Sequence, residues 1–162
     1  MTDATDAAEP GVTLNCQPGR EGETLVFPYS VINNSGGDIY VLDAVPELDP
    51  ESGAPRANLN TAVVARGEDG FAHILRGIAP LPRDRSVSMR VIPLGTKVAQ
   101  GGTLERRFTL SEPLHETGPY HPDLPLSRYR LRDIKGVMLT VHYLPATAEG
   151  FGAAPVDYAA DL

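Results

Sequence analysis

The residues best suited to chemistry gather in one Pro-rich segment, residues 111–127. Two histidines and two carboxylates fall within nine residues of it: His115, Glu116, His121 and Asp123. Imidazole and carboxylate groups are both ligands of zinc-like ions. Their spacing, however, matches no strand or helix that would hold such ligands in place before a metal binds. We interpret the segment as a rigid surface loop, and a metal-binding or metal-dependent protein is the alternative.

The same loop offers a contact surface for a protein partner. Tyr120 and His121 stand between Pro119 and Pro122, which restrict the backbone. Tyrosine is enriched at protein interfaces, but it also packs over the ends of cores with its hydroxyl on a backbone carbonyl. We predict no catalytic residue, no metal ligand and no cofactor. The candidate binding residues are His115, Tyr120, His121 and Asp123.

The other reactive side chains have simpler explanations. Cys16 is the only cysteine, and it alternates with apolar residues, so we expect it in the core as a small hydrophobe. His73 shares a strand face with apolar neighbours, which predicts a partly buried and hydrogen-bonded imidazole. His142 alternates with the apolar residues of its strand, which predicts a solvent-facing or inter-strand position.

Acidic residues cluster between positions 38 and 51. The ligand spacing of an EF-hand is absent from this stretch, so a calcium loop is disfavoured. We interpret the stretch as solvent-exposed charge that favours solubility. Its members are Asp38, Asp43, Glu47, Asp49 and Glu51.

The overall charge disfavours one large class of partner. The formal net charge is −7, whereas nucleic-acid-binding domains carry basic patches. No apolar run is long enough to cross a bilayer, and residues 1–10 lack the regions of a signal peptide. A single cysteine allows no intramolecular disulfide. We expect a cytoplasmic protein that binds neither nucleic acid nor membrane.

Apolar residues recur with a period of two along the chain, which predicts short strands. Residues 25–31 and 38–45 flank the turn-forming residues 33–37, and we interpret them as a hairpin. Pro28 cannot donate to a ladder, so its strand needs an edge position or a bulge. A second hairpin is expected from residues 61–66 and 71–78. Further strands are expected at 12–16, 87–91, 103–110 and 137–144, with a turn of helix near 126–133.

These strands define the predicted fold. The 16 glycines and 15 prolines are spread along the chain and disfavour long helices. About eight short strands, each with one apolar face, predict an all-β, immunoglobulin-like, two-sheet antiparallel β-sandwich. The predicted domain spans residues 11–145, after a disordered leader (1–10) and before a flexible or docking C-terminal tail (146–162).

Residues 25–35, an alternating strand ending in Asn-Asn-Ser, and the later Gly101-Gly102-Thr103 resemble bacterial immunoglobulin-like modules. They are also loosely similar to the intracellular proteinase inhibitor family of the BsuPI type. The resemblance implies the sandwich fold and assigns no functional residue. Inhibition of an intracellular protease through an exposed loop is a second alternative function.

The function predicted from the sequence is that of a non-enzymatic interaction module. Its partner would be another protein, bound through rigid loops or through an edge strand. Pro28 favours an exposed edge, so a homodimer formed by strand pairing is a further alternative.

Overall fold

The first sheet is built around β4 (Thr24–Asn33) in the computed structural model, which describes residues 7–9, 11–49, 51–53, 55–79, 93–117, 128–150, 153 and 160–161. β10 (Thr103–Ser111) pairs antiparallel with β4 along its whole length, with Phe108 opposite Phe27. Because side chains alternate between the faces of a strand, the core residues of the two strands lie on one shared face: Leu25, Phe27, Tyr29 and Val31 of β4, and Leu104 and Phe108 of β10.

On the side away from β10, β4 pairs with two short strands that are separated by a break. β2 (Val12–Cys16) and β3 (Gly19–Glu21) follow one another along it, and β1 (Ala7–Glu9) pairs outside β2. Pro28 lies opposite the interruption, and its carbonyl accepts a hydrogen bond of 3.3 Å from the Gln17 N–H. In an antiparallel ladder a residue directs its N–H and C=O to the same neighbour, so the missing N–H of Pro28 falls where the ladder is already broken. β4 is therefore a central strand, and the break accommodates the proline.

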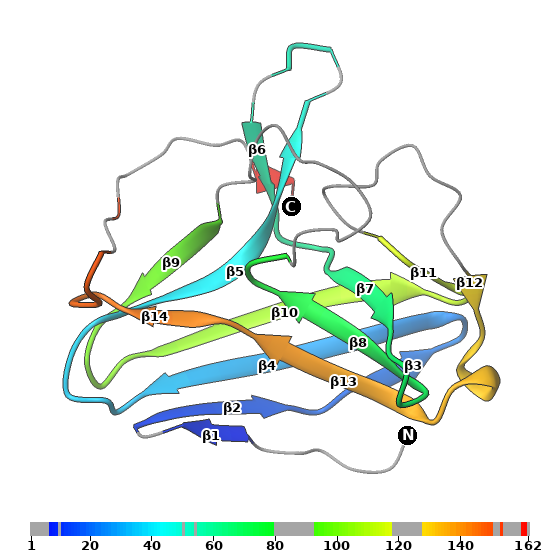
Figure 1. Cartoon of the computed structure of the whole chain (residues 1–162), viewed down its shortest axis with the longest axis horizontal. Helices are drawn as coiled ribbons and strands as arrows, with labels where there is room; N and C mark the ends of the chain where they lie inside the picture. The colour runs from blue at the N-terminus through cyan, green and yellow to red at the C-terminus, as the bar shows by residue number, and fades with distance from the viewer. Residues whose placement is uncertain are drawn as a thin grey trace.

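The second layer is organised around the C-terminal strands, which Figure 1 shows in front of the first sheet. β13 and β14 are separated only by His142, whose N–H donates to the Arg76 carbonyl and whose carbonyl accepts from the Leu42 N–H. This stretch therefore joins β8 on one side to β5 on the other. β7 completes one flank and β9 the other. The bounds are β5 (Ile39–Leu48), β7 (Val63–Arg66), β8 (Phe71–Arg76), β9 (Leu94–Val98), β13 (Gly136–Val141) and β14 (Tyr143–Pro145).

Smaller elements extend from these layers. The far end of β5 projects beyond the sandwich with β6, which pairs with β15 (Figure 1). β11 pairs with β12, and one turn of 3-10 helix, η1, follows. The bounds are β6 (Pro55–Asn58), β11 (Leu114–His115), β12 (Arg128–Tyr129), η1 (Leu131–Asp133) and β15 (Ala160–Asp161).

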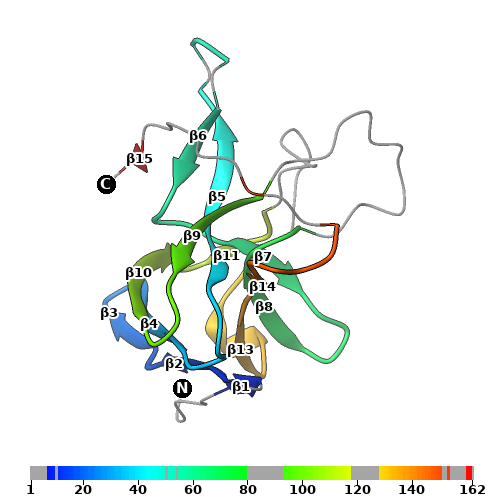
Figure 2. The ribbon, with the colours of Figure 1, turned by 90° about the vertical axis from the view of Figure 1, so that its left-hand side faces the viewer.

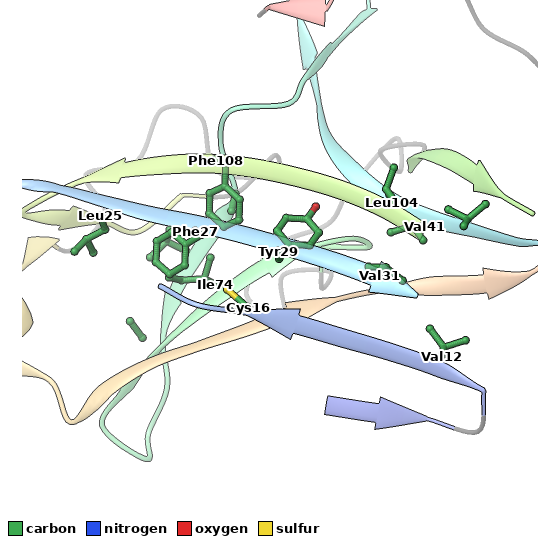
Figure 3. Packing of buried hydrophobic residues seen from close by; sticks show 14 of the residues in the cluster. Val12, Cys16, Leu25, Phe27, Tyr29, Val31, Val41, Ile74, Leu104 and Phe108 are labelled. Carbon is green, nitrogen blue, oxygen red and sulfur yellow. The ribbon is translucent and has the colours of Figure 1, made fainter. Parts of the chain in front are cut away.

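The apolar interior lies between the two layers (Figure 3). The rings of Phe27 and Phe108 stack with their centroids 4.9 Å apart, and Tyr29 meets Phe108 edge-on at 6.2 Å. Such ring pairs contribute roughly 0.5–1.5 kcal/mol beyond the area they bury. The second layer supplies the opposing side chains Ile39, Val41, Val64, Ala72 and Ile74.

The predicted all-β sandwich is confirmed. Most strand pairs are antiparallel, as predicted, but β13 runs parallel to β8 and β15 parallel to β6. The second predicted hairpin is confirmed as β7 and β8, and the strands predicted at 12–16, 103–110 and 137–144 are present. The predicted turn of helix corresponds to η1. Residues 87–91 lie outside the described residues.

The first predicted hairpin is wrong. β4 and β5 do not pair with each other, because the turn between them carries the chain from the first sheet to the second. The buried side chain of Asn33 organises this arch: its Nδ2 donates to the carbonyls of Gly37 (2.8 Å) and Val98 (3.0 Å), and its Oδ1 accepts from Ser35. Both strands turn their apolar faces inward, so a hairpin and an arch have the same alternation.

The two ends of the chain add short strands. Ala7–Glu9, within the predicted leader, forms β1, and Ala160–Asp161, within the predicted tail, forms β15. The predicted C-terminal segment therefore contributes a strand partner to β6.

We predict that Phe108→Ala lowers the free energy of unfolding by about 3–5 kcal/mol, since the buried ring leaves a cavity between Phe27 and Tyr29. Urea unfolding measures this loss. Met138→Ala, at a side chain that is 44% exposed, is the control and should change stability by at most about 0.5 kcal/mol. Equal effects of the two substitutions would contradict the described core.

Candidate functional site

β10 ends the first sheet and is paired on one side only in the part of the chain that the structure describes. It lies next to β9 where the two layers meet (Figure 2). An edge strand presents N–H and C=O groups that another extended chain can pair with. This edge is the candidate functional site.

The hydrogen-bond alternation decides which groups of β10 are available. Bonds from the Asn33 N–H to the Gly102 carbonyl (2.9 Å) and from the Glu112 N–H to the Glu23 carbonyl (2.8 Å) extend the ladder with β4 at its two ends. Even-numbered residues of β10 therefore bond to β4, and odd-numbered residues direct their N–H and C=O away from it. The outward-directed residues are Thr103, Glu105, Arg107, Thr109 and Ser111.

Two described contacts involve outward-directed residues of β10. The Nη1 of Arg106 donates to the Glu105 carbonyl at 3.3 Å, and the Thr109 hydroxyl lies 3.5 Å from Oδ1 of Asn60. The second contact places Asn60 at the C-terminal part of the edge. Between Thr103 and Arg107 the described contact is the one from Arg106 to the Glu105 carbonyl, whose second lone pair can still accept an N–H, so this stretch is the more open part of the edge.

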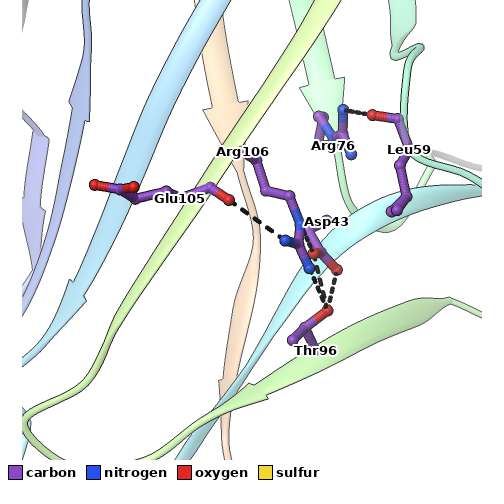
Figure 4. Close-up of polar contacts among 6 residues, drawn as sticks. All are labelled: Asp43, Leu59, Arg76, Thr96, Glu105 and Arg106. Atoms are coloured by element: carbon purple, nitrogen blue, oxygen red, sulfur yellow. Dashed lines mark hydrogen bonds and ion pairs between the residues drawn. The ribbon is translucent and has the colours of Figure 1, made fainter. Parts of the chain in front are cut away.

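An ion pair anchors β10 to the second layer (Figure 4). Arg106 points into the sandwich, where its Nε donates to Oδ2 of Asp43 on β5 at 2.6 Å. The Thr96 hydroxyl of β9 is 2.9 Å from the Asp43 carboxylate and accepts from Nη2 of Arg106 at 3.2 Å. The Asp43 side chain is only 1% exposed. Three strands from the two sheets are therefore bound together by one polar cluster.

A bulge in β5 sets the position of Asp43. The register on β9 shifts between Val41 and Ala44, so Leu42 and Asp43 face one residue, Gly95. A Cβ at Gly95 would lie 2.9 Å from the Val41 carbonyl oxygen, so the bulge needs glycine there. The interpretation of Asp43 as a solvent-exposed charge is wrong, because it is buried and paired. Of the same stretch, Asp38 pairs with Lys97 at the surface and Glu47 with Arg56.

Arg76 on β8 lies deeper in the same region and is fully buried. Its guanidinium carbon is 4.9 Å from the Phe108 ring centroid and 5.8 Å from that of Tyr29, and its Nη1 donates to the Leu59 carbonyl at 3.0 Å. A desolvated cation over aromatic faces gains about 2 kcal/mol. Burial lowers the pKa of the Arg76 guanidinium, and burial raises that of the Tyr29 hydroxyl to about 12. Tyr29 is thus neutral at physiological pH.

An open depression of about 620 Å³ lies on the outer face of the first sheet, beside the β10 edge. Two charged side chains of β10, Glu105 and Arg107, line its border and are exposed. The remaining outward-facing lining is polar except for Pro28: Asn15, Gln17 and Ser30. Such a surface suits a polar, extended ligand better than a compact apolar one.

Of the four predicted binding residues, the structure describes His115. It is exposed in β11 and lies opposite Arg128 of β12. Tyr120, His121 and Asp123 lie outside the described residues. Within the described residues no three His, Cys, Asp or Glu side chains are grouped as metal ligands would be. The metal site predicted as an alternative stays a prediction.

The charges of β10 are not among the candidate residues predicted from the sequence. Arg106 alternates with Leu104 and Phe108, so it occupies a core-facing position of a predicted strand. An inward-pointing charge in an otherwise apolar face is typical of edge strands. The run Glu105-Arg106-Arg107 was therefore the available signal.

The other reactive residues have structural roles. Cys16 is buried as predicted, and burial raises the pKa of its thiol to about 11, so it is protonated at neutral pH. His73 is half-buried as predicted, with Nε2 2.9 Å from Asp69. His142 occupies an inter-strand position as predicted, and its Nδ1 accepts from the Ile78 N–H at 3.0 Å.

No helix within the described residues has the length and hydrophobicity needed to span a membrane. No protein-family model, curated protein or solved structure matches this chain.

We predict that Asp43→Ala lowers the free energy of unfolding by about 3 kcal/mol, because it leaves the partly buried Arg106 without its counter-charge. Chemical denaturation measures this loss. Asp38→Ala, which removes a solvent-screened partner of Lys97, is the matched control and should cost far less. Losses of equal size would show that Asp43 does not anchor β10.

Proposed function

We propose that this protein is a non-enzymatic interaction module that binds an extended segment of a partner protein along β10. The observation that carries the proposal is that this nine-residue strand pairs on one side only among the residues that the structure describes. A peptide added at a sheet edge gains main-chain hydrogen bonds, and pockets or charges beside the edge select its side chains. The outward N–H and C=O groups from Thr103 to Arg107 suit this mode of binding.

The anchoring of β10 supports the proposal. Phe108 is held in the core, and Arg106 is tied to Asp43 and Thr96. A strand held in its binding conformation loses little further conformational freedom when a partner aligns with it. The edge is therefore preorganised for pairing.

Charge beside the edge supports selectivity. Glu105 and Arg107 stand next to each other on the outer face, at the border of the open depression. A partner strand with an acidic residue opposite Arg107 and a basic residue opposite Glu105 would bind more tightly, because both charge pairs are attractive. A strand with like charges at these positions would bind more weakly.

The residues predicted from the sequence to bind a partner begin close to the end of β10 along the chain. His115 in β11 is exposed and follows the last residue of β10 by only a few residues. We propose that His115, together with Tyr120, His121 and Asp123, contributes a second contact region.

We predict that Arg107→Pro abolishes binding by extended peptides, whereas Arg107→Ala retains most of it. Proline removes an N–H that points away from β4, so the internal ladder stays intact, while alanine removes only the charge. The probe is a displayed library of random peptides of about nine residues, the length of β10, with affinities measured by fluorescence anisotropy.

Circular dichroism and the unfolding midpoint serve as controls that both variants fold. Equal affinities of the Pro and Ala variants would contradict backbone pairing at the edge. A library that yields no binder to the wild-type protein, at a dilution where the protein is monomeric, would contradict the proposed function itself.

A further inference from the structure

The charges of β10 make its edge complementary to itself. Glu105 and Arg107 are both exposed, and neither forms an ion pair with another described residue. They lie two positions apart, so their side chains share the outer face. A second copy of the strand, running antiparallel, would present the same two charges in reversed order.

The pairing register decides whether these charges meet favourably. Only odd-numbered residues direct their hydrogen-bonding groups outward, so a two-fold pair of β10 strands can shift only in steps of two residues. In one register, Glu105 of each copy lies opposite Arg107 of the other copy. Thr103 of each copy then lies opposite Thr109 of the other, at the two ends of the paired stretch. The two neighbouring registers oppose Arg107 to Arg107 or Glu105 to Glu105. Opposite charges and Thr–Thr pairs stabilise cross-strand neighbours, and like charges destabilise them.

The inner face tolerates this register. Arg106 would lie opposite its own copy, but each guanidinium is already paired with Asp43 of its own chain at 2.6 Å. Asn60 lies beside Thr109, at the outer end of the register, rather than beside the central charges. The two central charge pairs therefore lie at the more open part of the edge.

We propose that a second copy of this chain adds its β10 to this edge, with Glu105 opposite Arg107, to form a two-fold dimer with one continuous sheet. The inference rests on the proposed function, because it names the partner that pairs with β10. A closed two-fold contact also consumes both free edges, which prevents further strand addition at β10.

Charge reversal tests the register. Sedimentation velocity over a concentration series should show a monomer–dimer equilibrium for the wild-type protein. E105R and R107E should each weaken dimerisation by roughly tenfold or more, since both central pairs become repulsive. An equimolar mixture of the two variants should form a heterodimer, and the double variant E105R/R107E should recover the wild-type affinity.

Two exposed positions away from β10 supply matched controls: E21R on β3 and R132E in η1. Both should leave the wild-type dimerisation unchanged. Dimerisation that is as strong in E105R and R107E as in the wild-type protein would overturn the proposed register.

A wild-type protein that stays monomeric at its highest soluble concentration would overturn the dimer. If that monomer still binds displayed peptides and loses them on Arg107→Pro, the edge function stands and only the identity of the partner is wrong. If the monomer does not bind displayed peptides either, both proposals fail.

Discussion

The ion pair between Asp43 and Arg106 links the two sheets at the place where each of them ends. Arg106 belongs to β10, the last strand of the first sheet, and Asp43 to β5, whose neighbour β9 ends the second layer. Thr96 of β9 completes the cluster. Without this link, the described contacts of β10 would be its ladder with β4, the packing of its apolar side chains and the long contact from Thr109 to Asn60. The geometry of the free edge thus depends on a carboxylate that is almost completely buried.

The same cluster explains how an exposed edge can remain specific. An inward-pointing charge disfavours indiscriminate pairing, because any added strand must leave Arg106 in its polar surroundings. The outward charges of Glu105 and Arg107 then distinguish one partner or register from another. Arg76, held over the Phe108 and Tyr29 rings, is a fully buried cation that packs against the aromatic side of the core. Anchoring and selectivity therefore come from neighbouring residues of one strand.

The sequence predicted the fold class because strand alternation and turn residues are local signals. β7 and β8 were predicted as a hairpin, and Cys16 as a buried residue, on this basis. It could not place β5, because an arch and a hairpin share the same alternation, and the difference lies in the contact of Asn33 with Val98, 65 residues away. The burial of Asp43 likewise depends on a bulge and on a partner from β10. The edge itself had one local signal, a charge at the core-facing position of Arg106.

Amide hydrogen exchange along β10, measured by NMR in dilute solution, distinguishes a free edge from one that is already paired. A one-sided strand predicts that the amides of Leu104, Arg106 and Phe108 exchange slowly, because they bond to β4, while those of Glu105 and Arg107 exchange rapidly. Raising the protein concentration or adding a bound peptide should slow the second group. Slow exchange at Glu105 and Arg107 in the dilute monomer would mean that the edge is already paired within the chain, and would contradict the account.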